Sequence, residues 1–246
     1  MDFTRADALR EQLRSLRPLN AAELKRLRDE FIVSNTYNSN AIEGNSLTLR
    51  ETALILEQGI TIGEKPLKDH LEAIGHRDAF EFMYTLVDRD EPLTEWVIKQ
   101  IHSLVLMNDR ENRGVYRGVP VTIAGAAHTP PQPYLIAPQL ETLLADYAAM
   151  KRERHIIDAI AEFHLRFEGI HPFIDGNGRT GRLIMNFELI KAGYLPVNIK
   201  YADRRKYYDC FDSYYGEAHS QEPLTALITG CEEEELSGYI QKMALL

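Results

Sequence analysis

Cysteine is scarce in this sequence, and long apolar runs are absent. Cys210 and Cys231 are the only two cysteines among 246 residues, and they lie far apart without the spacing of metal ligands. This usage argues against a disulfide framework and favours a reducing compartment. No apolar run approaches the roughly eighteen residues of a membrane span, and the first stretch, MDFTRADALREQLRSL, is too charged for a signal peptide. We therefore expect a cytoplasmic protein that does not enter a membrane.

Basic residues are fewer than acidic ones. The chain has 28 Lys and Arg against 37 Asp and Glu, which gives a formal net charge of −9 at pH 7. Proteins that bind a nucleic-acid backbone carry a basic face, so this balance argues against a nucleic-acid partner, although it is compatible with one local anion site. With 44% hydrophobic and 26% charged residues, the composition is typical of a soluble globular protein. The length predicts a single globular unit over residues 1–246.

Most of the chain has the pattern of helices. Asn20 with Glu23, and Thr48 with Glu51, have the spacing of capping boxes, which begin helices. The segment HIIDAIAEFHLRFEGI carries apolar residues at the period of a buried helix face, namely Ile156, Ile160, Phe163, Phe167 and Ile170. Similar periodicity in several other stretches predicts a mainly α-helical fold.

One region departs from the helical pattern. Residues 114–136, GVYRGVPVTIAGAAHTPPQPYLI, combine the β-favouring Val119, Val121 and Ile123 with Gly125 and several prolines. Proline has no backbone N–H group and is disfavoured inside helices and central strands. The segment therefore predicts a short β-hairpin or an extended flap.

The stretch HPFIDGNGRTGR separates two helical segments. We expect a helix to begin near Arg179, and the free N–H groups and partial positive charge at its N-terminus attract anions. Gly176 and Gly178 let the backbone turn its amides toward a ligand, and Asn177 adds a side-chain donor. Arg179 and Arg182 lie three positions apart on one helical face, where two guanidinium groups can hold successive phosphates.

Two further residues of this stretch fit phosphate chemistry. Asp175 would repel a phosphate unless a cation lay between them, and Mg²⁺ favours one or two carboxylates together with phosphate oxygens. His171 can then act as a base beside a phosphorus centre. The alternative is a glycine-rich helix corner with surface arginines and a structural histidine. The coincidence of a base, a carboxylate, an anion-binding turn and paired arginines in one loop favours an active site.

The same stretch matches the pattern H-x-F-x-[DE]-G-N-G-R-x-x-R, and on that basis the chain resembles the Fic family, also called the Fido fold. The similarity extends to the preceding AEFHLRFEGI, to the flap and to the following RRKYYDCF, and it covers about residues 93–225. The resemblance implies a mainly α-helical catalytic core with a short β-hairpin flap. It also implies transfer of AMP from ATP to a Ser, Thr or Tyr hydroxyl of a target protein, with release of pyrophosphate.

The resemblance implies a role for each residue of the motif. His171 resembles the base that takes the hydroxyl proton, and Phe173 resembles the buried aromatic residue that anchors the loop. Asp175 resembles the ligand of a Mg²⁺ ion that bridges the α- and β-phosphates. Arg179 matches the first motif arginine, which contacts phosphate or orders the loop, and Arg182 matches the arginine that holds the γ-phosphate. The cradle for the phosphate chain consists of Gly176, Asn177 and Gly178.

The flap and a pair of tyrosines also have counterparts in the family. Residues 119–129 resemble the hairpin that docks the target, since an exposed strand edge can hold an extended segment by main-chain hydrogen bonds. The candidate docking residues are Val119, Val121, Ile123 and Thr129. Tyr207 and Tyr208 fall where relatives line the adenine pocket, and Tyr208 is the candidate for nucleotide binding. Packing of a helix into the core explains both tyrosines equally well, so both interpretations stay open.

A second motif lies near the N-terminus. The stretch SNAIEGN matches the pattern [ST]-x-x-x-E-[GN] of the Fic inhibitory helix through Ser39, Glu43 and Gly44. In relatives whose inhibitory segment precedes the core, the glutamate pairs with the second motif arginine, here Arg182, and takes the place of the γ-phosphate. The resemblance therefore implies an autoinhibited enzyme that binds ATP with a misaligned α-phosphate. The alternative is an ordinary helix end at Gly44.

The resemblance also suggests an organisation and leaves alternatives open. It places N-terminal helices with the inhibitory motif at residues 1–60, the core at about 93–225 and a C-terminal helix at 226–246. Homodimers are common in the family. A Fic enzyme that uses another nucleotide or a phosphocholine donor, or that removes AMP from its target, would carry the same motif. A latched regulatory protein that acts by contacts alone is a different class, and the intact His171 and Asp175 argue against it.

Overall fold

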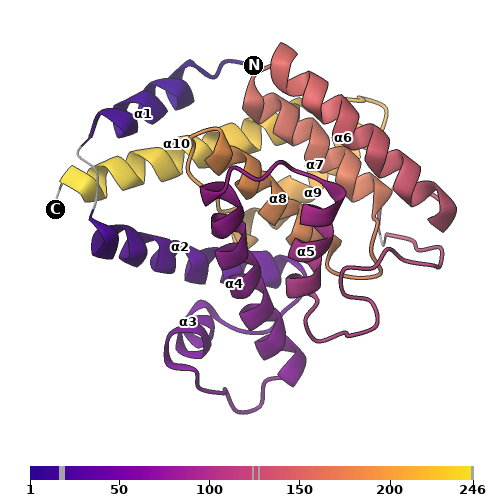
Figure 1. The fold of residues 1–246 in the computed structure, drawn as a ribbon, viewed down its shortest axis with the longest axis horizontal. Helices are drawn as coiled ribbons and strands as arrows, with labels where there is room; N and C mark the ends of the chain where they lie inside the picture. The colour runs from indigo at the N-terminus through magenta and orange to yellow at the C-terminus, as the bar shows by residue number, and fades with distance from the viewer. Residues whose placement is uncertain (17–19, 124, 127, 245–246) are drawn as a thin grey trace.

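Ten α-helices and two short 3-10 turns make up the described part of the chain, residues 1–16, 20–123, 125–126 and 128–244 of a computed structural model (Figure 1). The first half contains α1 (Thr4–Ser15), α2 (Ala21–Ile42), α3 (Leu49–Gln58), α4 (Leu67–Asp88) and α5 (Glu95–Val105). The second half contains η1 (Pro133–Leu135), α6 (Ile136–Glu153), α7 (Ile156–Ile170), α8 (Asn177–Lys191), η2 (Tyr201–Asp203), α9 (Arg204–Tyr215) and α10 (Glu222–Ala244).

Helix α8 lies at the centre of the bundle, where it packs against α7, α4 and α5 and touches α2 (Figure 1). The apolar face predicted for α7 is confirmed for Ile160, Phe163, Phe167 and Ile170, which are buried, whereas Ile156 is half-buried. Nearly all of α8 is buried as well, including polar residues. Asn186 can be buried because its amide exchanges two hydrogen bonds with the backbone of Val197, at 2.8 and 3.1 Å.

Helix α2 brings the N-terminal region to the centre. The predicted capping boxes are both present, at Asn20 for α2 and at Thr48 for α3. The C-terminal half of α2 is buried although it is polar, and its amides bond to the chain after α8: Asn35 Nδ2 donates to Val197 O at 3.1 Å, and Asn38 Oδ1 accepts from Tyr201 N–H at 2.9 Å. These bonds hold the C-terminal half of α2 against the segment that follows α8.

The prediction of a β-hairpin flap is wrong. The described residues form no strand, and the segment between α5 and η1 is an extended loop in which Ala126 N–H bonds to Ile123 O in a turn at 3.2 Å. The prolines of this segment cannot donate to a strand ladder. Arg117 holds the loop instead, because its guanidinium donates to the carbonyls of His171, Val119 and Pro131 at 2.8, 2.9 and 2.6 Å.

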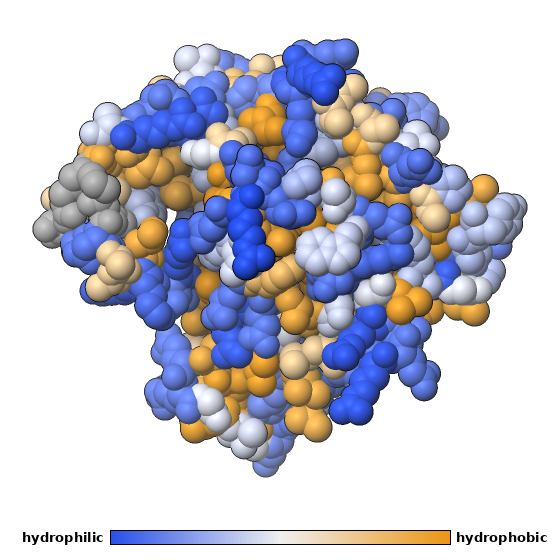
Figure 2. All heavy atoms as spheres, viewed as in Figure 1, coloured by the Kyte–Doolittle hydropathy of each residue, from blue (hydrophilic) through white to orange (hydrophobic). Residues whose placement is uncertain are grey.

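Two positions within the flap, Ala124 and Ala127, lie outside the described residues. Of the candidate docking residues, Val119 and Thr129 are exposed, whereas Val121 and Ile123 are half-buried. Hydrophilic and hydrophobic side chains are mixed over the face of the molecule seen in Figure 2. Within the described ranges, every helix is too short or too polar to span a membrane.

Candidate active site

The motif loop between α7 and α8 has a left-handed backbone conformation at each end. His171 ends α7 in the left-handed conformation, with φ 48° and ψ 60°, and Gly176 precedes α8 with φ 78°. Such a conformation is uncommon for a residue with a side chain and marks functional or strained positions. Asn177 closes the loop, because its amide accepts from Phe173 N–H and donates to Phe173 O, both at 2.9 Å.

Phe173 anchors the loop from inside. Its ring is fully buried and stacks on the ring of His102 from α5, with centroids 3.6 Å apart. His102 Nδ1 accepts from Gly114 N–H at 2.8 Å, so Nε2 carries the proton and donates to Asp175 O at 2.9 Å. Burial lowers the pKa of His102 to about 4, which keeps the ring neutral. Sequence patterns gave no reason to select His102, because a lone histidine on an apolar helix face is usually structural.

One hydrogen bond fixes the tautomer of His171. Its Nδ1 lies 3.3 Å from Glu168 O, and a carbonyl oxygen only accepts, so the proton is on Nδ1 and Nε2 has a free lone pair. No hydrogen bond to Nε2 is found within the described ranges. Burial is the largest influence on this ring and lowers the pKa of His171 below its ordinary value. The ring is therefore neutral near pH 7 and able to accept a proton.

A cavity of about 440 Å³ lies between this histidine and the N-terminus of α8. Its walls include His171, Gly178, Arg182 and Glu43, together with part of the flap and aromatic residues of α9. Glu168 also lines the cavity, where a charged carboxylate would disfavour an anion. Burial is the largest influence on Glu168 and raises its pKa to about 8, although the nearby Arg182 acts in the opposite direction. Glu168 is mostly uncharged at pH 7.

The carboxylate of Glu43 lies over the N-terminus of α8. A Cβ added to Gly178 would come within 2.2 Å of Glu43 Oε1 and 3.0 Å of Arg182 Nη1. Only a residue without a side chain leaves room for this approach. The site that the sequence predicts for an anion thus contacts a negatively charged group of the protein itself, as the macrodipole of α8 favours.

Arg182 is buried and joins α8 to the end of α2. Its Nε donates to Ser39 Oγ at 3.1 Å, and its Nη2 donates to Ser39 O at 2.9 Å and to Glu43 Oε1 at 2.8 Å. Glu43 is the C-cap of α2 and is followed by Gly44 at φ 90°. Arg182 Nη1 is buried without a hydrogen-bond partner among the residues described here, so the guanidinium keeps one donor for a ligand.

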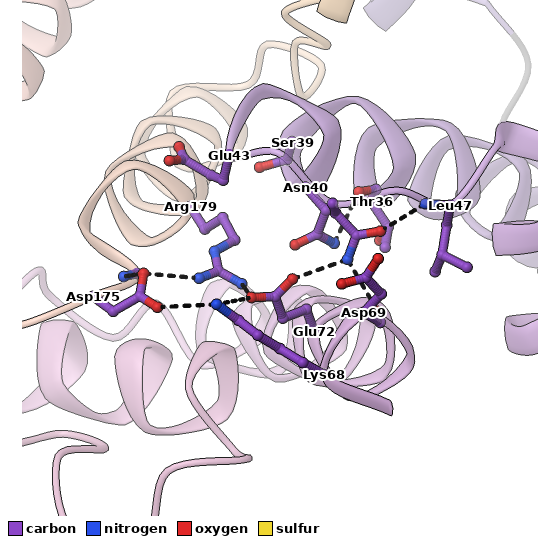
Figure 3. A network of polar contacts seen from close by, with 12 residues as sticks. Thr36, Ser39, Asn40, Glu43, Leu47, Lys68, Asp69, Glu72, Asp175 and Arg179 are labelled. Carbon is purple, nitrogen blue, oxygen red and sulfur yellow. Dashed lines mark hydrogen bonds and ion pairs between the residues drawn. The ribbon is translucent and has the colours of Figure 1, made fainter. Parts of the chain in front are cut away.

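Arg179 has a different environment from Arg182. Its side chain is only 2% exposed, and it lies between two carboxylates (Figure 3): Nη2 donates to Asp175 Oδ1 at 3.2 Å, and Nη1 forms an ion pair with Glu72 Oε1 at 3.1 Å. The sequence left two roles open for this arginine. Its contacts are those of a residue that orders the loop.

Asp175 presents one oxygen for a ligand. Oδ1 accepts from Gly176 N–H at 2.6 Å and from Arg179, whereas Oδ2 lies 3.8 Å from Lys68 Nζ, and the side chain is 48% exposed. Within the described ranges, no group of three or more His, Cys, Asp or Glu residues could hold a metal ion. A single accessible carboxylate fits Mg²⁺ only when phosphate oxygens supply further ligands, as the ion prefers.

The two tyrosines of α9 have different surroundings. Tyr207 is buried, with its hydroxyl 2.7 Å from His164 Nε2, whereas Tyr208 is 46% exposed at the cavity and donates to Ile42 O at 3.1 Å. At the far wall, His128 stacks on Tyr215 with centroids 4.1 Å apart and donates to Gly169 O at 2.8 Å. His128 belongs to the predicted flap but was not among the candidate site residues, and Tyr215 belongs to no recognisable motif.

Residues 92–189 match the model of the Fic/DOC family. This chain carries a Fic/DOC domain. The family resemblance inferred from the motif is confirmed. Proteins named "Protein adenylyltransferase Fic" are similar to nearly the whole chain: that of Nematostella vectensis is 33% identical over 240 residues, 95% of this chain and 54% of the relative, and that of Aedes aegypti is 34% identical over 247 residues, 97% and 47%. The chain spans about half the length of these relatives.

Solved structures that contain Fic domains are also similar. A Fic domain containing signaling protein from Bacteroides thetaiotaomicron superposes with a TM-score of 0.88 at 29% identity, over 98% of this chain and 97% of that chain. Fic-1 from C. elegans superposes with a TM-score of 0.87 at 27% identity, over 99% of this chain and 72% of that chain. The similarity therefore includes the helices on both sides of the Fic domain.

Proposed function

We propose that this chain is a protein adenylyltransferase, which transfers AMP from ATP to a Ser, Thr or Tyr hydroxyl of a target protein or of itself. The observation that carries the proposal is that one cavity is lined by a neutral histidine, the N-terminus of α8 and a buried arginine, with His171 and Arg182 on its walls. The names of the relatives at 33% and 34% identity support it.

The residues of the cavity account for each step of the transfer. The phosphate chain of ATP lies over the free amides at the start of α8, and Arg182 holds the γ-phosphate. His171 Nε2 takes the proton of the target hydroxyl, whose oxygen attacks the α-phosphorus. The bond between this phosphorus and the bridging oxygen of the β-phosphate breaks, and pyrophosphate leaves. Positioning and charge stabilisation supply most of the rate of such transfers.

The metal completes the charge balance of the nucleotide. Asp175 Oδ2 is the accessible carboxylate oxygen next to the phosphate site, so Asp175 would hold Mg²⁺ together with phosphate oxygens. When bound, Mg²⁺ neutralises the negative charge that develops on the phosphates. The role we assign to Asn177 is to close the loop rather than to bind nucleotide, because Phe173 engages both ends of its amide.

We place the adenine of ATP and the target protein away from the phosphate site. Tyr208 offers a half-exposed aromatic face for the adenine, next to the other aromatic residues of α9. The target segment lies along the described residues of the flap, of which Val119 and Thr129 are exposed. The described residues of the flap form no strand, so this docking does not use the strand edge that the sequence predicted.

The contact between Glu43 and Arg182 supports an autoinhibited state. Glu43 Oε1 accepts from Arg182 Nη2 at 2.8 Å and also approaches Gly178. A γ-phosphate needs the same guanidinium and the same amides. We infer that ATP binds productively only after the carboxylate has withdrawn, and that Ser39 and Gly44 shape the inhibitory turn.

A donor comparison tests the proposed function. The Glu43→Gly variant is incubated with ATP labelled at the α-phosphate, with ATP labelled at the γ-phosphate, and with α-labelled GTP, UTP and CTP. AMP transfer incorporates the α-label of ATP and adds the mass of one AMP to the protein. Incorporation of the γ-label would indicate phosphorylation, and preference for another α-labelled nucleotide would replace AMP by that nucleotide. Absence of every label, with a mass gain from CDP-choline, would identify a phosphocholine donor.

The rate should depend on pH through His171. Only the neutral ring accepts a proton, and burial lowers the pKa of His171 below the ordinary value of about 6.5. Activity is therefore retained at pH 6.5 and is lost as the pH falls through the lowered pKa. We expect kcat/KM for AMP transfer by Glu43→Gly to show an acidic limb with its midpoint below pH 6.5. The affinity for ATP, measured over the same pH range, distinguishes protonation of His171 from protonation of the nucleotide. A midpoint above pH 6.5 would contradict the role of His171 as the base.

A further inference from the structure

A buried carboxylate outside the motif contacts the motif arginine Arg179 and does not line the cavity. Glu72 belongs to α4 and is only 6% exposed. Figure 3 shows its side chain directed at Arg179. Glu72 Oε1 lies 3.1 Å from Arg179 Nη1, and Glu72 Oε2 accepts from Asn45 Nδ2 at 2.9 Å. Lys68 Nζ lies 3.5 Å from the same Oε1 but is 58% exposed, so solvent weakens that contact.

Arg179 depends on Glu72 for its orientation. A guanidinium that is almost fully buried needs charged partners, because removal of one partner leaves an uncompensated charge. The partners found here are Glu72 on one side and Asp175 on the other. The guanidinium lies between the two carboxylates: Nη2 donates a hydrogen bond to Asp175, whereas Nη1 makes no hydrogen bond within the described ranges and is held by the charge of Glu72 at 3.1 Å. The position of α4 therefore acts on the motif loop through this ion pair.

Asp175 in turn depends on Arg179. The carboxylate is half-exposed, so packing alone does not fix its rotamer. Gly176 N–H and Arg179 Nη2 both bind Oδ1, at 2.6 and 3.2 Å, whereas Oδ2 has only the exposed Lys68 Nζ as a charged neighbour in the described ranges, at 3.8 Å, and is the oxygen that a cation can reach. His102 holds the carbonyl of the same residue at 2.9 Å. The backbone and one carboxylate oxygen are thus fixed by different helices.

We propose that Glu72 is a positioning residue: through Arg179, it aims the Asp175 carboxylate at the metal carried by the nucleotide. The inference rests on the proposed function for the identity of the nucleotide. Glu72 itself does not touch the nucleotide or the metal. Residues that orient a metal ligand without touching the ion typically contribute about 10- to 100-fold to metal affinity or activity.

The test measures how far Mg²⁺ strengthens ATP binding. Calorimetry gives the Kd of ATP in Mg²⁺ and in EDTA, in a Glu43→Gly, His171→Ala background that neither blocks the site nor turns over. Glu72→Gln preserves the shape of the side chain and removes its charge. We expect it to reduce the Kd ratio between EDTA and Mg²⁺ about tenfold and to leave the Kd in EDTA unchanged. A merely structural residue would weaken ATP binding equally in both conditions, and that result overturns the proposal.

A double-mutant cycle shows whether Glu72 acts through Asp175. Asp175→Asn should abolish most of the metal effect, and adding Glu72→Gln should then change nothing further, since residues that act in series are not additive. Additive losses overturn the proposal. Glu188→Gln is the matched control, because Glu188 is a buried glutamate of α8 that pairs with Lys151 at 3.0 Å and Tyr147 at 2.8 Å. Its Kd ratio should equal that of the background.

Two further measurements keep the outcome decisive. If Glu72→Gln does not fold in a thermal unfolding assay, Arg179→Lys replaces it, because a lysine cannot span two carboxylates in a fixed plane; the same fall in the Kd ratio is expected, and an unchanged ratio overturns the proposal. The proposed function fails separately, if Glu43→Gly transfers no AMP to any protein. A normal transfer reaction together with an unchanged Kd ratio in Glu72→Gln rejects the positioning role alone.

Discussion

Glu43→Gly is expected to raise incorporation of AMP about 10- to 100-fold over the intact protein. A hydrogen bond between charged groups contributes about 1.5–3 kcal/mol, and each 1.4 kcal/mol corresponds to about a tenfold change in equilibrium. The bond from Arg182 Nη2 to Glu43 Oε1, at 2.8 Å, is of this kind, and the arginine is buried. Its loss frees the guanidinium for the γ-phosphate.

The fold should tolerate this substitution. Glu43 is the C-cap of α2 with φ −87°, a conformation that glycine can also adopt, and the left-handed position after it is already Gly44. Ser39 still accepts from Arg182 Nε and Nη2. The assay compares label from α-labelled ATP on equal amounts of both proteins, with and without added substrate proteins. Glu43→Gln is the matched control: it keeps the length of the side chain and one acceptor oxygen but loses the charge, so we expect an intermediate rate.

Three outcomes of that comparison would contradict autoinhibition through Glu43. Equal incorporation by the intact protein and Glu43→Gly would show that the ion pair with Arg182 does not limit the reaction. Absence of incorporation by both proteins, with normal ATP binding, would favour a regulatory protein that acts by contacts alone. A lower net incorporation in Glu43→Gly would instead favour a role of the glutamate in the reaction itself.

The central part of the site is predictable because it is continuous in sequence. His171, Asp175 and Arg182 lie within one helix–turn–helix segment, whose glycines and charges predict an anion site before any tertiary contact is known. The contact between Glu43 and Arg182 joins positions 139 residues apart. No local pattern predicts such a pair; only the family resemblance brought the two residues together.

The remaining parts of the site and fold were not predictable because their signals are tertiary. Glu72 and His102 lie on α4 and α5, and in the sequence they look like ordinary helical residues; their roles arise only when these helices pack on α8. In the flap, local signals predicted a strand that the described residues do not form. Val119, Val121 and Ile123 favour a strand locally, but the neighbouring prolines offer no N–H groups, and Arg117 bonds to the loop carbonyls instead.

His171→Ala should lower the rate of AMP transfer about 10²–10⁴-fold, the usual contribution of a well-placed base, measured in the Glu43→Gly background. ATP should bind with unchanged affinity, because the phosphate contacts come from α8 and Arg182. The ring contributes one weak hydrogen bond, from Nδ1 to Glu168 O at 3.3 Å, so its loss alone should not unfold the loop.

The backbone at this position requires a second variant. His171 has φ 48°, where alanine is strained and asparagine is better tolerated. A rate loss caused by strain in the loop should therefore be smaller in His171→Asn than in His171→Ala, whereas loss of a base should be equal in both, since neither side chain accepts a proton near pH 7. Equal loss with unchanged ATP affinity supports the base. Retained incorporation of the α-label by either variant would assign proton removal to another group, and the neutral ring facing the cavity would then be structural.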